Sequence, residues 1–234
     1  MKKFLFAFIL SCLVIDIAIT AHLHAAPSCG TRLPPQKKFE WGYEYNSMFK
    51  DRLSHDFGYM QTQDHFITLS CGVADWFSID GKIGFGDVTQ RNGKLPHLDY
   101  NTSFAGGYGF RFRVYRNEEL GLRGIIGFQH ICVHPWARSI DDDKYESILD
   151  DWQGSALLAK DFKFVTLYAG MKGSDGQIIY TINKHDKKRV SSDWHLGLIT
   201  GIEVYLLPDK KTRLSAEGRF FDETALSASV SYLF

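Results

Sequence analysis

Hydrophobic and polar residues alternate along most of the chain, from Phe39 to the last residue. The pattern is clearest in residues 103–115, where aromatic residues alternate with Arg111 and Arg113. A period of two places successive side chains on opposite faces of a β-strand. Each of ten segments is therefore predicted to be a strand: 39–48, 64–73, 76–88, 103–115, 120–133, 152–160, 164–172, 194–206, 213–221 and 225–234. The sixth has the weakest alternation, so eight strands are the alternative.

The links between these segments alternate in length. Short links cover residues 74–75, 117–119, 160–163 and 208–212, and long links cover 49–63, 89–102, 134–151 and 173–193, before a short final link at 222–224. This rhythm is typical of outer-membrane barrels, which have short periplasmic turns and longer extracellular loops. With an even number of strands, both ends of the barrel domain lie on the periplasmic side.

One face of the predicted strands carries many charges of both signs. In a dry core each unpaired charge would cost several kcal/mol or more. Alternation also fits a soluble, lipocalin-like barrel, but the charges make better sense lining a narrow hydrated lumen. We therefore predict a closed antiparallel transmembrane β-barrel. Arg111, Arg113, Arg123 and Arg219 are expected to point inward and to pair with Glu44, Asp80, Glu203 or Glu217. The predicted lumen network is Glu44, Asp80, Lys82, Arg111, Arg113, Arg123, Glu203, Glu217 and Arg219.

Composition agrees with a barrel and excludes other classes. Lys plus Arg number 27 and Asp plus Glu number 27, so the chain lacks the net basic charge that would indicate nucleic-acid binding. Mean hydropathy is −0.19, which excludes a helical membrane protein but not a barrel, where only alternate residues face lipid. Tryptophans favour membrane interfaces, so we expect Trp41 and Trp76 at the periplasmic interface and Trp152 and Trp194 at the extracellular one. Trp136 is expected in a loop.

The first residues are typical of an export signal. Lys2 and Lys3 precede an apolar run over residues 4–15, and small residues follow. We predict a signal peptide at 1–28 with cleavage near 26–28, a periplasmic lead-in at 29–38, and a barrel domain at 39–234; an uncleaved anchor is the alternative. Cleavage would place Cys29 first, as in a lipoprotein, although no Leu stands three residues before it. Cys71 and Cys132 are expected near opposite membrane faces, too far apart for a disulfide.

The last strand resembles a known assembly signal. Alternating apolar residues that end in an aromatic residue are similar to the C-terminal signal of bacterial outer-membrane proteins, and here they are Leu226, Ala228, Val230, Tyr232 and Phe234. The resemblance implies that the barrel-assembly machinery reads this strand, which then closes the barrel against residues 39–48. With the export signal and the link rhythm, the chain resembles the small outer-membrane barrels of bacteria in general. That class implies contact with outer-membrane lipid and lipopolysaccharide, but its members have many functions.

The segment 128–134 carries the most specific candidate chemistry. His130 and Cys132 share the lipid-facing side of a predicted strand near its extracellular end, in a placement that resembles the His-x-Ser of barrel lipid A deacylases. A thiol beside an imidazole is a possible nucleophile, and its acidic partner is unassigned among Asp141, Asp142, Asp143 and Glu146. An inert interfacial histidine and an apolar cysteine are the favoured interpretation. His130 and His134 lie about 13 Å apart on a strand, so no metal site is expected.

The remaining motifs predict no cofactor. Gly106, Gly107 and Gly109 lack the helix that a nucleotide loop requires. The charge runs 141–143 and 187–189 are interpreted as solvated loops. The favoured function is a non-enzymatic outer-membrane barrel acting as a narrow passive pore or a structural surface protein. The alternatives are a lipid-modifying hydrolase at His130 and Cys132, and adhesion or surface recognition through the long loops.

Overall fold

The computed structural model describes residues 30–185 and 187–234. The predicted signal peptide, its cleavage site and Cys29 therefore lie outside the described residues. Across the described ranges, no helix combines the length and the apolar character needed to cross a bilayer.

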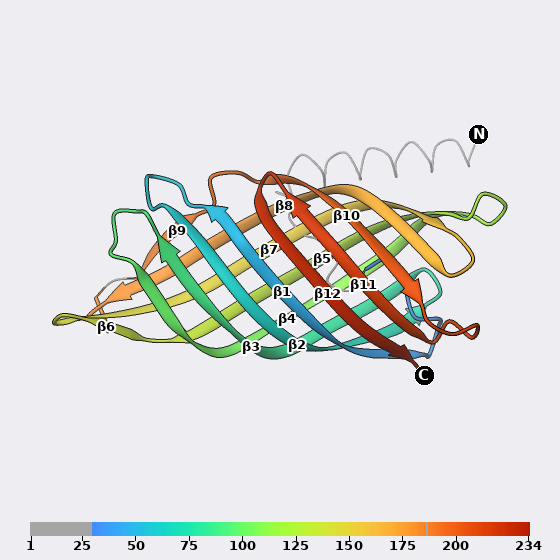
Figure 1. Cartoon of the computed structure of the whole chain (residues 1–234), viewed down its shortest axis with the longest axis horizontal. Coiled ribbons are helices and arrows are strands. Elements are labelled where there is room, and N and C mark those ends of the chain that lie inside the picture. The colour runs from blue at the N-terminus through green and yellow to red at the C-terminus, as the bar shows by residue number, and fades with distance from the viewer. Residues whose placement is uncertain (1–29, 186) are drawn as a thin grey trace, which may run out of the picture.

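The described chain consists of strands joined by turns (Figure 1). Their bounds are β1 (Phe39–Arg52), β2 (Tyr59–Ala74), β3 (Phe77–Arg91), β4 (Leu98–Asn117), β5 (Leu122–Trp136), β6 (Arg138–Ile140), β7 (Asp143–Asp161), β8 (Val165–Ile182), β9 (Lys188–Ser191), β10 (Leu196–Tyr205), β11 (Thr212–Phe220) and β12 (Glu223–Leu233).

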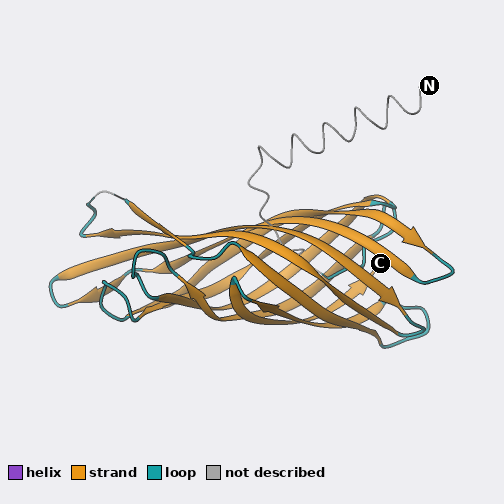
Figure 2. Cartoon of the chain, turned by 90° about the horizontal axis from the view of Figure 1, so that it is seen from above, coloured by secondary structure: helices purple, strands orange, loops and turns teal. Residues whose placement is uncertain are grey.

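Ten of these strands form a closed antiparallel barrel (Figure 2). The order around the wall is β1-β2-β3-β4-β5-β7-β8-β10-β11-β12, and the wall closes where β12 pairs with β1. The short strands β6 and β9 pair with the outer ends of β7 and β8. This arrangement confirms the predicted ten-stranded barrel and excludes the eight-stranded alternative.

The C-terminal strand closes the barrel as predicted. In the β1–β12 ladder Glu40 lies opposite Leu233, and the backbone nitrogen of Phe234 donates to the carbonyl of Phe39 over 2.8 Å. Tyr232 and Phe234 face outward with their rings in edge contact, 5.0 Å between centroids. Closure matters because an open strand edge in lipid would leave backbone groups unpaired, at several kcal/mol each.

The predicted long links were wrong, because most of their residues extend the strands. Among the described residues of these links, only 53–58, 92–97, 137, 141–142, 183–185, 187 and 192–193 lie outside strands, and the sixth barrel strand, β7, has 19 residues. Trp136, expected in a loop, ends β5 instead and is exposed.

The strand extensions escaped prediction because their polarity is inverted. In the half of the barrel nearest the C-terminus, outward residues such as Ile79 and Ile83 are apolar and more than half exposed, while inward residues are charged or polar. In the other half many inward side chains are apolar and pack into one buried cluster, beside buried polar residues such as Asp51 and Gln90, while most outward ones are polar. The cluster includes Met60, Phe66, Val88, Leu98, Tyr100, Val133, Leu149, Ile178 and Tyr180.

The two halves have different physical roles. Exposed apolar residues encircle the first half, and a belt of this kind around charged inward side chains is stable only against lipid. This half therefore spans the membrane, and the soluble-barrel interpretation does not hold for it. The second half continues beyond the membrane and holds together around its own apolar core, as a soluble barrel does.

Candidate functional site

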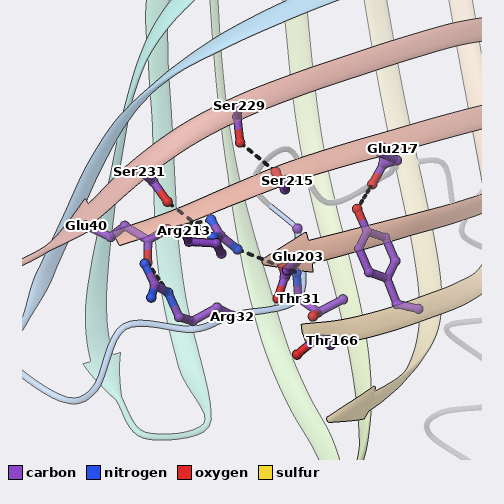
Figure 3. A network of polar contacts seen from close by, with 12 residues as sticks. Thr31, Arg32, Glu40, Thr166, Glu203, Arg213, Ser215, Glu217, Ser229 and Ser231 are labelled. Atoms are coloured by element: carbon purple, nitrogen blue, oxygen red, sulfur yellow. Dashed lines mark hydrogen bonds and ion pairs between the residues drawn. The ribbon is translucent and has the colours of Figure 1, made fainter. Parts of the chain in front are cut away.

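A network of buried ion pairs lies in the end of the lumen nearest the C-terminus (Figure 3). The Arg213 guanidinium donates to Glu203 over 2.8 Å and to Glu40 over 2.5 Å. Glu40 also accepts from Arg32 over 2.6 Å, and the backbone nitrogen of Thr31 donates to Glu203 over 2.6 Å. Because both Arg213 and Glu203 are almost completely buried, each charge depends on these partners.

Arg111 joins the barrel wall to the segment that precedes it. Its guanidinium forms two parallel hydrogen bonds to Asp80, of 2.7 and 2.6 Å. It also donates to the backbone carbonyls of Gly30 and Arg32, over 3.1 and 2.7 Å. The planar fork of arginine suits this role, since it can bind a carboxylate on one side and carbonyls on the other.

A second charge cluster lies deeper in the lumen. Lys172 is fully buried and forms ion pairs with Asp222, at 2.9 Å, and with Glu223. Arg219 contacts Glu223 at 2.9 Å and Glu217 at 3.6 Å. In the same region, the Lys82 ammonium donates to Glu44 over 2.8 Å.

Of the four arginines expected to pair in the lumen, Arg111 bonds Asp80 and Arg219 lies 3.6 Å from Glu217, whereas the other two have different partners. Arg123 pairs with Asp161 over 2.7 Å rather than with one of the four named carboxylates. Arg113 is partly exposed near the turn after β2, where it donates to the Asp75 carbonyl. Sequence reasoning also missed the half-buried Asp161 and several buried members of the network: Glu40, Lys172, Arg213, Asp222 and Glu223.

Part of the predicted lead-in lies inside the barrel. Residues 30–34 are buried, and the Arg123 guanidinium donates to the Thr31 carbonyl over 2.9 Å. Leu33 packs into an inner apolar cluster with Ile125, Leu157, Ala159, Tyr168 and Ile199. We call residues 30–34 the plug. They show no alternating pattern in the sequence, so periodicity did not reveal them.

The four interfacial tryptophans lie on the outer surface. Trp41 is half-exposed near the start of β1, and Trp76 lies in the turn before β3. Trp152 belongs to β7 and faces outward, while Trp194 is exposed just before β10.

His130 and Cys132 lie on the outer wall, where β5 pairs with β7. The His130 imidazole contacts the Asp150 carboxylate over 2.5 Å through Nε2. Trp152 covers the imidazole, 4.2 Å between ring centroids, and Tyr108 lies 5.2 Å away on the other side. In the β5–β7 ladder Asp150 lies directly opposite Cys132. The wall thus brings a thiol, an imidazole and a carboxylate to one aromatic-lined patch.

The acidic partner of His130 is therefore Asp150 and none of the four residues considered from the sequence. That choice was wrong because residues 143–151 were assigned to a loop, whereas they form strand and place Asp150 beside β5. Among the described residues, His130 bonds Asp150 and forms no hydrogen bond to Cys132. Cys71 and Cys132 are both free cysteines. No group of three potential ligands in the described ranges has metal-site geometry.

Comparison with known proteins finds similar barrels at low identity. Ail, the attachment invasion locus protein of Yersinia pestis, is 10% identical, covering 85% of this chain and 99% of its own, with a TM-score of 0.44. The translocator domain of the autotransporter NalP from Neisseria meningitidis is 9% identical over 100% and 97%, with a TM-score of 0.45. An outer membrane channel of Pseudomonas putida F1 is 9% identical over 90% and 100%, with a TM-score of 0.46. No protein-family model and no curated protein matches the sequence.

The assignment to the outer membrane rests on the molecule itself. A closed antiparallel barrel with an even number of strands, an apolar belt outside and charges inside is the architecture by which β-strands span that membrane. The protein is a bacterial outer-membrane β-barrel.

Proposed function

We propose that the protein is a structural surface barrel that does not conduct ions. The observation that supports this proposal is the burial of its inward-facing charges. Arg111, Lys172 and Arg213 have side chains that are at most 1% exposed. Side chains that line an open water column would be accessible to solvent, as in porins. Passive conduction, the other half of the favoured sequence interpretation, therefore has less support.

Two further features support a sealed lumen. The segment 30–34 occupies the periplasmic end, and the apolar cluster fills the extracellular half. An ion crossing that apolar cluster would lose much of its hydration, which is costly. The extracellular half of the barrel then serves as a stalk that holds the surface turns above the membrane.

Planar-bilayer recording tests this proposal. We expect the purified barrel to insert without uniform conductance steps in concentrated potassium chloride, because its lumen is filled. A porin recorded in parallel controls for detection, and protection of the inserted barrel from protease controls for insertion. Regular steps that scale with the amount of inserted protein would contradict the proposal.

A second candidate, a lipid-modifying hydrolase, is favoured by the contact between His130 and Asp150 beside Cys132. In such a reaction the Cys132 sulfur would attack an ester carbonyl carbon, forming a C–S bond as the C–O bond breaks. His130 would take the thiol proton and give it to the leaving alcohol. Water would then hydrolyse the thioester, releasing the fatty acid and restoring the thiol.

The hydrolase candidate makes a specific prediction about Cys132. If it holds, the purified protein releases fatty acid from a glycerolipid ester in mixed micelles, and Cys132→Ala and His130→Gln each slow release about 100-fold or more. Cys71→Ala is the matched control, because Cys71 faces outward near the opposite end of the barrel. The absence of release by the unchanged protein, or equal effects of the two cysteine substitutions, would eliminate the candidate.

A further inference from the structure

A polar pocket lies at the extracellular end of the barrel, where three segments of the chain meet. It has a volume of about 310 Å³, and its lining comes from the end of β1 with the turn that follows it, the turn between β3 and β4, and the link before β10. The two turns lie side by side at the end opposite the C-terminus (Figure 1). A pocket of this volume can hold a small molecule, since ligand pockets range from about 300 to 1,000 Å³. Its polar residues are Arg52, His55, Asp56, Asn92 and Asp193.

Backbone contacts between the three segments fix the walls of the pocket. Gly58 lets the two turns approach closely, because a Cβ at this position would lie 1.9 Å from the carbonyl oxygen of Arg91. The backbone nitrogen of Asp193 donates to the carbonyl of Arg52 over 2.7 Å, which joins the link to the end of β1. The pocket is therefore built into the fold and does not depend on one loose loop.

Polar residues occupy three strained backbone positions around the pocket. His55, Asp56 and Asn92 have left-handed φ angles of 56°, 61° and 57°. Glycine adopts this conformation readily, whereas these three residue types only tolerate it better than most. Strained positions of this kind gather at ligand-binding sites. The three side chains are therefore candidates for contacts with a ligand.

Most side-chain groups in the pocket have no partner among residues 30–185 and 187–234. Four groups there form no hydrogen bond or ion pair: the Arg52 guanidinium, the Asn92 amide, and the carboxylates of Asp56 and Asp193. The guanidinium only donates hydrogen bonds, the carboxylates only accept them, and the amide does both. A ligand that satisfies all four groups must supply donors and acceptors close together.

We propose that this pocket binds one neutral sugar unit of a surface glycan. Each hydroxyl group of a sugar both donates and accepts, so neighbouring hydroxyls can satisfy the carboxylates and the guanidinium together. A simple anion would attract Arg52 but be repelled by Asp56 and Asp193, and a simple cation would meet the reverse. This proposal adds recognition of a ligand to a structural barrel and is independent of whether the lumen conducts.

Ligand-observed NMR of the whole barrel in lipid nanodiscs tests the proposal. The probes are the methyl glycosides of glucose, galactose, mannose and N-acetylglucosamine, whose blocked anomeric oxygen mimics the linkage to a glycan. We expect at least one of them to bind with a dissociation constant of about 1 mM or tighter, and about tenfold more tightly than alanine or inorganic phosphate. Binding of none of these glycosides would overturn the proposal. Equal or tighter binding of alanine would mean a site for zwitterions, and equal or tighter binding of phosphate a site for anions, and either result would also overturn it.

Substitutions by glycine locate the sugar in the pocket. Asp56→Gly and Asn92→Gly each remove one hydrogen-bonding group and keep the left-handed backbone. Asp56→Gly should weaken binding of the glycoside about tenfold or more, because its carboxylate makes a charge-assisted hydrogen bond, and Asn92→Gly about threefold. Asp141→Gly is the matched control, since Asp141 is also exposed, has a φ of 52° and lies in the turn between β6 and β7 outside the pocket.

The control should leave binding unchanged. Unchanged binding in both pocket variants, or an equal loss in the control, would overturn the site. If a turn variant fails to fold, Arg52→Gln at the end of β1 tests the same pocket. It should weaken binding of the glycoside about tenfold or more, and unchanged binding in this variant would overturn the site as well.

Discussion

Replacing Lys172 with methionine should lower the free energy of unfolding by about 3–5 kcal/mol, the cost of breaking a buried ion pair from one side. The Lys172 ammonium is fully buried between Asp222 and Glu223. Methionine fills a similar volume but carries no charge, so the two carboxylates lose a positively charged partner. Glu223 keeps Arg219 as a partner, at 2.9 Å, whereas within residues 30–185 and 187–234 Asp222 keeps only the hydroxyl of Ser174, at 2.7 Å.

Urea unfolding in lipid vesicles, followed by tryptophan fluorescence, measures this loss. The matched control is Lys144→Met, because Lys144 pairs with Glu146 while about half of each side chain is exposed. Exposed pairs contribute about 0–1 kcal/mol, so the control should change little. Adding Asp222→Asn to Lys172→Met should restore part of the loss by removing an uncompensated charge. Equal losses in the Lys172 and Lys144 variants would mean that the lumen is hydrated at this depth.

The sequence was sufficient to predict the closed ten-stranded barrel, because that part of the fold follows from local signals. Outward apolar residues alternate with inward polar ones over the membrane-spanning half, and lipid imposes this pattern on every strand. Short turns such as residues 75–76 make consecutive strands neighbours in the wall. Beyond the membrane the pattern inverts, so that Met60 and Tyr100 face inward while Gln63 and Asp99 face outward. A prediction that expects apolar residues to face outward therefore assigns these inverted stretches to loops.

The candidate sites were only partly predictable, because they depend on pairing between distant segments. Arg213 and Glu40 are separated by 173 positions and meet only because β12 lies between their strands and closes the barrel. Asp222 and Glu223 were assigned to a turn, although Glu223 shares the inward face of β12 with Ala225. His130 was found from its local motif, but Asp150 required the β5–β7 register.

The plug at the periplasmic end should detach when Arg111 is replaced by methionine. Arg111 is 1% exposed and holds the carbonyls of Gly30 and Arg32 while pairing with Asp80. Methionine removes both carbonyl contacts and leaves Asp80 buried without its partner. The cost of about 3–5 kcal/mol that this implies need not unfold the barrel, because local detachment of residues 30–34 lets water reach the carboxylate.

Limited proteolysis distinguishes detachment of the plug from unfolding of the barrel. Trypsin cleaves after arginine, and Arg32 in the unchanged protein is buried and bonded to Glu40. We expect Arg111→Met to increase the rate of cleavage at Arg32 at least about tenfold, while the barrel keeps its resistance. Arg111→Lys should give a similar increase, since an ammonium cannot bind a carboxylate and two carbonyls in the planar geometry of a guanidinium.

Arg116→Met is the control for this experiment, because Arg116 pairs with Glu118 while both side chains are more than half exposed. Its substitution should leave the rate of cleavage at Arg32 unchanged. If Arg111→Met also leaves the rate unchanged, the plug is held by the remaining contacts of Thr31 and Leu33 and not by Arg111. If the variant loses the barrel and the plug together, residues 30–34 are an integral part of the wall's stability, since the charge network would then fold as one unit.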